Sequence, residues 1–192
     1  MSVLPAPAVE GASTGQTLGQ FLASVEHRAY RFALYELWDR EAALDAVQDS
    51  MLRLTERYAD RPSAEWPAIF FTILRNRATD AKRWRAWRRV RGLLRGDRYG
   101  EEDDPLASIP SPVDGPDAGA EARQQRERIE EALRALPARQ RQVFLLREWQ
   151  GLTAVETAQV LGCSVGAVKQ HHFRALKALR AKLSEVWHGE TR

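Results

Sequence analysis

The chain has 192 residues, of which 44% are hydrophobic and 29% charged, and its formal net charge is +3. This length accommodates one ordinary domain or two small ones, and the sequence has no run of about 18 apolar residues that could cross a membrane. The single cysteine, Cys163, excludes an internal disulfide, and no Cys/His cluster has the spacing of a zinc site. We therefore expect a soluble, cytoplasmic protein that is not inserted in a membrane and needs no cofactor or metal ion.

Charge is distributed unevenly along the chain. Residues 75–95 contain nine basic residues and one acid, whereas residues 97–121 contain eight acids and one base. The acidic stretch also has four prolines and no apolar periodicity, which is typical of a segment that cannot bury enough surface to fold. The prediction is a disordered lead (1–17), two small helical domains (18–92 and 123–187), a flexible acidic Pro/Gly-rich linker between them (93–122) and a tail (188–192).

The first domain is predicted to consist of helices, because Ala, Leu, Arg, Glu and Gln dominate and alternating β-branched residues are missing. The expected helices are 18–38, 40–58 capped by Asp39, and a third with Pro67 in its first turn that continues to about 91, after a loop at 59–65. On the second helix, apolar residues at three- and four-residue intervals are expected to be buried, namely Leu44, Val47, Met51, Leu54 and Tyr58.

Another face of the same helix carries Asp45, Gln48, Asp49 and Leu52, which taken alone would be an ordinary solvated face. Farther along, Trp84 and Trp87 alternate with arginines. This composition suits a surface that binds a nucleic-acid strand, but either tryptophan could equally belong to the core.

The second domain is predicted to contain helices at 123–136, 138–149, 154–161 and 165–183, so the whole chain is expected to be all-α. Thr153 and Glu156 have the spacing of a capping box, and Gly162 suits a left-handed turn. Ser164 can cap the last helix. The segment after Leu183 fits either a frayed tail or a packed extension.

A helix-turn-helix needs a small residue where its helices cross, a glycine in the turn and an apolar residue on the second helix. Ala158, Gly162 and Val168 meet these needs in order. The remaining inner positions are assigned to apolar residues, namely Val155, Val160, Leu161, Val165 and Leu176. The pattern favours DNA binding over a merely structural helical hairpin.

The last helix separates into two faces at about 100° per residue. One face, around Val168, should be buried. The other carries Gln170, Phe173 and Arg174, with Lys169 beside it, and such side chains can contact adenine, a thymine methyl group, guanine or phosphate. The alternative is a solvated polar face without a partner.

For three further residues, a purely structural role is the alternative to metal binding or redox chemistry. His172 falls on the inner face and suits a hydrogen-bonded core histidine better than a metal ligand. His171 is its neighbour, so the two rings point about 100° apart and do not readily share a metal ion. Cys163 suits packing better than redox chemistry.

Motifs in both halves resemble the bacterial sigma factors of RNA polymerase, in particular the compact extracytoplasmic-function group, which keeps conserved regions two and four. The sequence DAVQD from Asp45 to Asp49 is similar to the clamp-binding helix of region two, and residues 66–80 are similar to the segment that handles the melted promoter. Residues 132–147 look like the start of region four, and residues 151–175 look like its promoter-reading part.

The resemblance implies a non-catalytic subunit that binds core RNA polymerase at its clamp and flap, recognises the minus-ten and minus-thirty-five promoter elements and promotes DNA melting. It also implies an anti-sigma factor as a partner. The implied clamp-binding residues are Asp45, Gln48, Asp49 and Leu52. The implied minus-ten residues are Asn76, Asp80, Arg83, Trp84 and Arg88, and the implied minus-thirty-five residues are Arg147, Lys169, Gln170, Phe173 and Arg174.

The chain departs from the family pattern at Ala167, Gln170 and His171, where threonine, serine and arginine are frequent, so the family's usual upstream sequence is not transferred to it. Two rival functions remain. A stand-alone helix-turn-helix regulator would need a receiver domain, and the first half lacks the alternating strands and helices of one. A small helical RNA-binding protein or nucleic-acid enzyme is the second rival, although no phosphate loop, metal motif or nucleophile signature is present.

Overall fold

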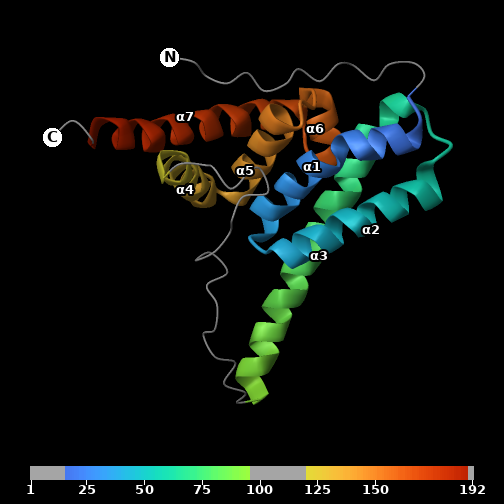
Figure 1. Ribbon diagram of the computed structural model, residues 1–192, viewed down its shortest axis with the longest axis horizontal. Helices are drawn as coiled ribbons and strands as arrows, with labels where there is room; N and C mark the ends of the chain where they lie inside the picture. Colours follow the sequence, from blue (N-terminus) through green and yellow to red (C-terminus); the bar gives the residue numbers. More distant parts are fainter. Residues whose placement is uncertain (1–15, 96–119, 190–192) are drawn as a thin grey trace. The chain divides into compact units, whose positions relative to one another are not determined.

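The structure is a computed structural model that describes residues 16–95 and 120–189. Within these residues all regular elements are helical, and the chain divides into two compact units (Figure 1). The first unit contains α1 (Leu18–Leu37), α2 (Arg40–Tyr58), a short 3₁₀ turn (Ser63–Glu65) and α3 (Trp66–Arg95). The second contains α4 (Ala120–Ala135), α5 (Ala138–Phe144), a π-helical segment (Leu145–Trp149), α6 (Ala154–Leu161) and α7 (Val165–Gly189).

The predicted all-α fold with two helical parts is confirmed. Most of the predicted lead, linker and tail lies outside the described residues. In the part of the chain that the structure describes, no helix combines the length and apolar character needed to span a bilayer.

The core of the first unit is built from aromatic and aliphatic side chains where α1, α2 and α3 pack on one another. Phe32, Phe70 and Phe71 are fully buried. The ring of Phe71 meets the other two edge to face, with centroid separations of 5.8 Å to Phe32 and 5.3 Å to Phe70. Because such rings each bury a large apolar area, this cluster supplies much of the stability of the unit.

On α2 the predicted burial is confirmed for Val47 and Leu54, Met51 and Tyr58 are half-buried, and only Leu44 departs from the prediction. It begins where the N–H of Ala42 donates to Asp39 Oδ1 over 2.9 Å, which confirms the predicted cap. Its buried side chains are mostly small, namely Ala43, Ala46, Val47, Ser50 and Leu54. Leu44 is 49% exposed, so its assignment to the core is wrong. The physical reason is that α1 and α3 approach α2 closely over the small residues, and Leu44 lies about 100° from Ala43 around the helix.

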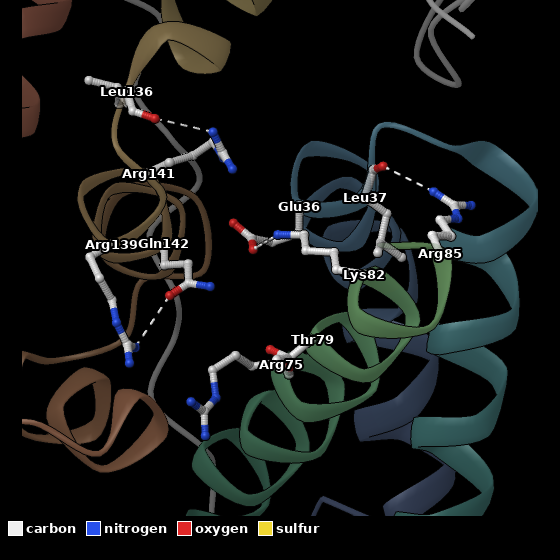
Figure 2. Close-up of polar contacts among 10 residues, drawn as sticks. All are labelled: Glu36, Leu37, Arg75, Thr79, Lys82, Arg85, Leu136, Arg139, Arg141 and Gln142. Atoms are coloured by element: carbon white, nitrogen blue, oxygen red, sulfur yellow. Dashed lines mark hydrogen bonds and ion pairs between the residues drawn. The ribbon is translucent and has the colours of Figure 1, made fainter. Parts of the chain in front are cut away.

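Two ion pairs attach the middle of α3 to the junction between α1 and α2. The ammonium Nζ of Lys82 lies 2.6 Å from Oε2 of Glu36, whose side chain is buried. About one turn along the helix, Arg85 pairs with Asp39. Arg85 also donates to the carbonyl of Leu37 over 3.4 Å, as Figure 2 shows. These contacts fix the rotation of α3 about its own axis.

The second unit packs α4, α5 and α6 around α7. Leu133, Leu145, Leu146 and Val160 are fully buried there. Polar contacts join the shorter helices. Arg139 of α5 donates to the carbonyl of Leu161 at the end of α6 over 3.3 Å, and Figure 2 shows its bond to Gln142.

The helix predicted at 138–149 changes character halfway. After Phe144 the chain forms a π-helical segment, and the N–H of Gln150 donates to the carbonyl of Leu145 over 3.1 Å. Such wide turns are rare and are found most often at functional sites. Arg147 and Glu148 belong to this segment, so its wide turn determines their positions just before the turn into α6.

The turn between α6 and α7 follows the sequence prediction closely. The capping box is present, with the N–H of Glu156 donating to Thr153 Oγ1 and the N–H of Thr153 donating to Glu156 Oε2. Gly162 ends α6 in the left-handed region at φ 63°, and Ser164 accepts from the N–H of Ala167. Val155 is the exception, because it is exposed where an inner position was predicted. It stands in the first turn of α6.

Candidate nucleic-acid interface

The outer face of α2 combines acidic, amide and apolar side chains. Asp45, Gln48 and Asp49 are exposed as predicted, and Leu52 extends into solvent on the same side. Leu44 joins this face one turn before Gln48, so the surface has an apolar residue at each end. Sequence periodicity missed Leu44 because it assigned this leucine to the core. Asp49 lies 3.8 Å from Arg77 of α3, a largely solvated pair that contributes little stability.

Asn76 and Asp80 lie one turn apart on the exposed side of α3. Arg83 is exposed on the next turn, with Nη1 3.8 Å from Oδ1 of Asp80. These three side chains form a polar row that the packing of the unit leaves open. Elsewhere in the unit, desolvation by burial lowers the pKa of the Arg28 guanidinium on α1, yet an arginine stays charged at physiological pH.

Trp84 and Trp87 are surface residues, with 56% and 54% of their area exposed. The interpretation of either one as a core residue is therefore wrong. The guanidinium of Arg88 lies over the ring of Trp84, 4.5 Å from its centroid, and that of Arg91 lies over Trp87 at 4.8 Å. Each is a cation–π contact at a spacing of four residues, and this spacing is the signal by which Arg91 could have been found in the sequence.

The outer face of α7 matches the predicted wheel. Val168 and Ala175 are buried, whereas Lys169, Gln170 and Arg174 are exposed. Phe173 is 68% exposed in the middle of the helix. Its ring is therefore accessible to a partner.

Arg147 does not belong to α7 and is only partly exposed. Its Nη1 donates to the carbonyl of Leu152, in the turn between the π-helical segment and α6. This guanidinium is therefore held beside the start of α6. Because the guanidinium is planar, the hydrogen bond to Leu152 also sets the direction of its other N–H donors.

His172 is partly exposed and paired, because its Nε2 lies 2.6 Å from Oε1 of Glu148. The pair joins α7 to the π-helical segment. Cys163 is partly exposed in the turn before α7. Among the described residues, no group of three or more His, Cys, Asp or Glu side chains could hold a metal ion.

Residues 126–179 match the family model described as sigma-70, region 4. Over 185 residues the chain is 32% identical to the ECF RNA polymerase sigma factor SigL of Mycobacterium tuberculosis, an alignment that covers 93% of this chain and 96% of SigL. The sigma factor RpoE, solved in complex with the anti-sigma factor NepR from Bartonella quintana, superposes with a TM-score of 0.60 at 25% identity over 86% of this chain and 96% of that one. CnrH, solved in complex with the cytosolic domain of CnrY, shares the fold with a TM-score of 0.58 at 24% identity over 92% of this chain and 94% of that one.

Proposed function

The chain belongs to the extracytoplasmic-function sigma factors of RNA polymerase, and from this premise we propose which of its surfaces bind the polymerase and which bind the promoter. As a sigma factor it is a non-catalytic subunit that binds core RNA polymerase and promoter DNA. The match to SigL spans most of the chain, which leaves the stand-alone regulator and the RNA-binding protein without support. Its place of action is the cytoplasm, with RNA polymerase.

The outer face of α2 is the surface proposed to bind the polymerase clamp. Asp45, Gln48 and Asp49 supply hydrogen-bond acceptors and negative charge, and the exposed Leu52 supplies apolar area at the edge. The face therefore offers a partner hydrogen-bonding and charged groups in its middle and apolar area at its edge. Leu44 extends the same surface.

The polar row on α3 is proposed to capture an unpaired base of the minus-ten element. Asn76 and Asp80 offer a donor and acceptors for a base edge, and Arg83 and Arg88 offer charge for phosphates. Extruding a base from a duplex costs a few kilocalories per mole, and hydrogen bonds together with stacking on an aromatic ring such as Trp84 offset that cost.

In the second unit, α6 and α7 form the proposed helix-turn-helix, with α7 in the major groove of the minus-thirty-five element. The observation that carries this assignment is the exposed set Gln170, Phe173 and Arg174 on the side of α7 opposite to its buried face. Amide and guanidinium groups can pair in bidentate fashion with adenine and guanine. Lys169 and Arg147 are proposed to contact phosphates and position the helix.

Two further assignments belong to this proposal. The domains are residues 18–92 and 123–187, and the acidic composition of the segment between them disfavours contact with DNA. An anti-sigma factor is proposed as a regulatory partner, supported by the complex of RpoE with NepR, which superposes on this chain.

The test is transcription with core polymerase, with and without this protein, on pooled genomic fragments, followed by sequencing of the transcript starts. We expect starts that share two upstream motifs. Asp45→Ala or Gln48→Ala should remove all of them, because the polymerase is no longer bound. Arg174→Ala should weaken them according to their upstream base, by about 1–3 kcal/mol per lost bidentate contact.

Matched controls separate these roles from general damage. Glu26→Ala removes an exposed acid on α1, and Lys182→Ala removes an exposed base on a different side of α7 from Gln170 and Phe173. Both should leave the starts unchanged. Starts that do not depend on the protein, or that survive both Asp45→Ala and Arg174→Ala, contradict the assignment.

A further inference from the structure

The π-helical segment before α6 has three consecutive side chains that each contact a different part of the second unit. Arg147 donates to the carbonyl of Leu152 in the turn into α6, Glu148 contacts His172 of α7, and the ring of Trp149 meets that of Phe144 of α5 edge to face at a centroid separation of 6.1 Å. The segment is therefore tied to α5, to the start of α6 and to α7 at once.

The contact between Glu148 and His172 is short and directional. Nε2 of His172 lies 2.6 Å from Oε1 of Glu148, and the histidine side chain is 23% exposed. Because the partner is a carboxylate, Nε2 is the donor, whether the ring is neutral or an imidazolium. A hydrogen bond restricts both distance and angle, whereas apolar burial has no preferred direction. The contact therefore limits sliding and rotation of α7 against the π-helical segment more than apolar packing alone.

His172 lies away from the proposed DNA-reading face of α7. At about 100° per residue, it is about 160° around the helix from both Gln170 and Arg174. Its partner Glu148 directly follows Arg147 in the chain. The pair therefore connects the neighbour of the proposed phosphate contact with the inner side of the helix proposed to read bases.

The proposed DNA contacts of this unit stand on separate elements, so the protein has to fix their spacing. Arg147 belongs to the π-helical segment, whereas Gln170 and Arg174 belong to α7. Phosphate contacts set the register of a protein on the duplex, and base contacts read the sequence. Since N–H···O distances fall between about 2.7 and 3.2 Å, a shift of about 1 Å between the two elements breaks one set of contacts when the other is made.

We propose that Glu148 and His172 are positioning residues for recognition of the minus-thirty-five element. Their hydrogen bond holds Arg147 at a fixed distance from the base-reading face of α7, and neither side chain contacts DNA. This inference rests on the proposed function of α7. Because 43% of the glutamate side chain is exposed, the contact is weaker than a buried ion pair, and its loss should weaken promoter binding by about threefold to fivefold.

The first test measures the affinity of the complete holoenzyme for a fully paired promoter fragment taken from the mapped starts. Glu148→Ala and His172→Ala should each weaken binding about threefold to fivefold. The double variant should lose no more than either single variant, because both substitutions remove the same contact.

Glutamine variants separate the hydrogen bond from the charge. Glu148→Gln keeps an acceptor at Oε1, and His172→Gln places an amide donor near the position of Nε2. Both should retain most of the affinity. Glu148→Gln and Glu148→Ala remove the same negative charge, so the difference between them reports the hydrogen bond and not a change in repulsion from DNA.

Matched controls remove the same chemical groups elsewhere. Glu131→Ala takes away an exposed acid of α4, and His27→Ala takes away an exposed histidine of α1. Both should leave promoter binding unchanged. Circular dichroism checks that every variant remains helical.

The second test distinguishes positioning from a loss of stability. In the otherwise unchanged protein, Arg147→Ala should reduce the salt dependence of promoter binding by about one counterion, because one phosphate contact is lost. In the His172→Ala background the same substitution should change the salt dependence much less, since Arg147 is then no longer held at its phosphate. A merely structural role would reduce the folded fraction and leave the effect of Arg147→Ala intact.

Two kinds of result overturn the positioning role alone. One is promoter binding that is unchanged in both alanine variants, or weakened as much by the glutamine variants as by alanine. The other is additive loss in the double variant or an undiminished effect of Arg147→Ala in the His172→Ala background. Failure of the proposed function looks different, because Arg147→Ala, Gln170→Ala and Arg174→Ala would then leave promoter binding unchanged in the otherwise unchanged protein.

Discussion

In the first unit α3 is held by side chains that are far apart in the sequence, whereas in the second unit the turn that presents α7 is held by near neighbours. Lys82 and Arg85 each reach a carboxylate 46 residues away. In the second unit, the N–H of Ala167 donates to Ser164 Oγ three residues away, and Gly162 sets the turn by its own backbone. The angle between α6 and α7 is thus specified locally, but the rotation of α3 depends on the whole fold of its unit.

The exposed aromatic residues of the two units also have different neighbours. Phe173 stands on α7 among hydrogen-bonding side chains, an arrangement suited to the edges of paired bases. Trp84 and Trp87 stand under arginines, an arrangement suited to the faces of unpaired bases. The proposed contact with the duplex therefore lies in the locally specified unit, and the proposed contact with the melted minus-ten strand lies in the unit with long-range contacts.

The prediction with the largest expected effect on stability tests whether the two units unfold independently. Phe70→Ala removes a fully buried ring from the first unit and should lower its free energy of unfolding by about 3–5 kcal/mol. Thermal unfolding followed by circular dichroism should show one transition moving down while the transition of the second unit stays in place. Leu145→Ala, in the core of the second unit, should give the reverse pattern. A single transition that moves as a whole in both variants would show that the units unfold together.

A smaller effect tests the long-range contacts directly. Lys82→Met should lower the free energy of unfolding by about 2–3 kcal/mol, because it removes the ammonium that lies 2.6 Å from the buried carboxylate of Glu36. Adding Glu36→Gln should restore much of this loss, since a neutral amide costs less to bury. Chemical denaturation measures both. If Lys82→Met lowers the free energy of unfolding no more than the exposed substitution Arg57→Met does, the ion pair of Lys82 with Glu36 does not hold α3 in place.

The smallest effect tests the local turn. Gly162→Ala places a Cβ at φ 63° and should cost about 1–2 kcal/mol. Gly166→Ala is the matched control, because this glycine is helical and its added Cβ would meet only Ser164 Oγ at 3.9 Å. It should leave stability unchanged or raise it by up to about 1 kcal/mol. Equal destabilisation by both substitutions would contradict the special role of the left-handed turn.

Predictions from the sequence were most accurate where neighbouring residues decide the structure. The predicted bounds of α6, residues 154–161, are those observed, because a capping box starts the helix and a glycine ends it. The exposed residues of α7 followed from its periodicity, since one strongly apolar stripe leaves little choice about which side is buried.

Predictions failed where a second helix decides which side is buried. Leu44 and Val155 have suitable spacing for the core, yet both lie at the edge of the face that the neighbouring helices cover. Trp84 and Trp87 could not be assigned from sequence because indole and guanidinium groups alternate on that part of α3. The π-helical turn at Leu145–Trp149 also gave no sequence signal, since one wide turn does not alter the apolar spacing enough to be seen.

By itself, the sequence determined the helical class, the turn between α6 and α7 and the sigma-factor motifs, because caps, turn residues and apolar period act over a few residues. The tertiary structure alone decided the rotation of α3 and the exposure of Leu44, Trp84 and Trp87. The rotation of α3 depends on Glu36 and Asp39 reaching it from distant positions in the chain, and the exposure of Leu44 depends on the packing of α1 and α3 against α2. Helical periodicity states which residues share a side, but only packing between helices decides which side meets solvent.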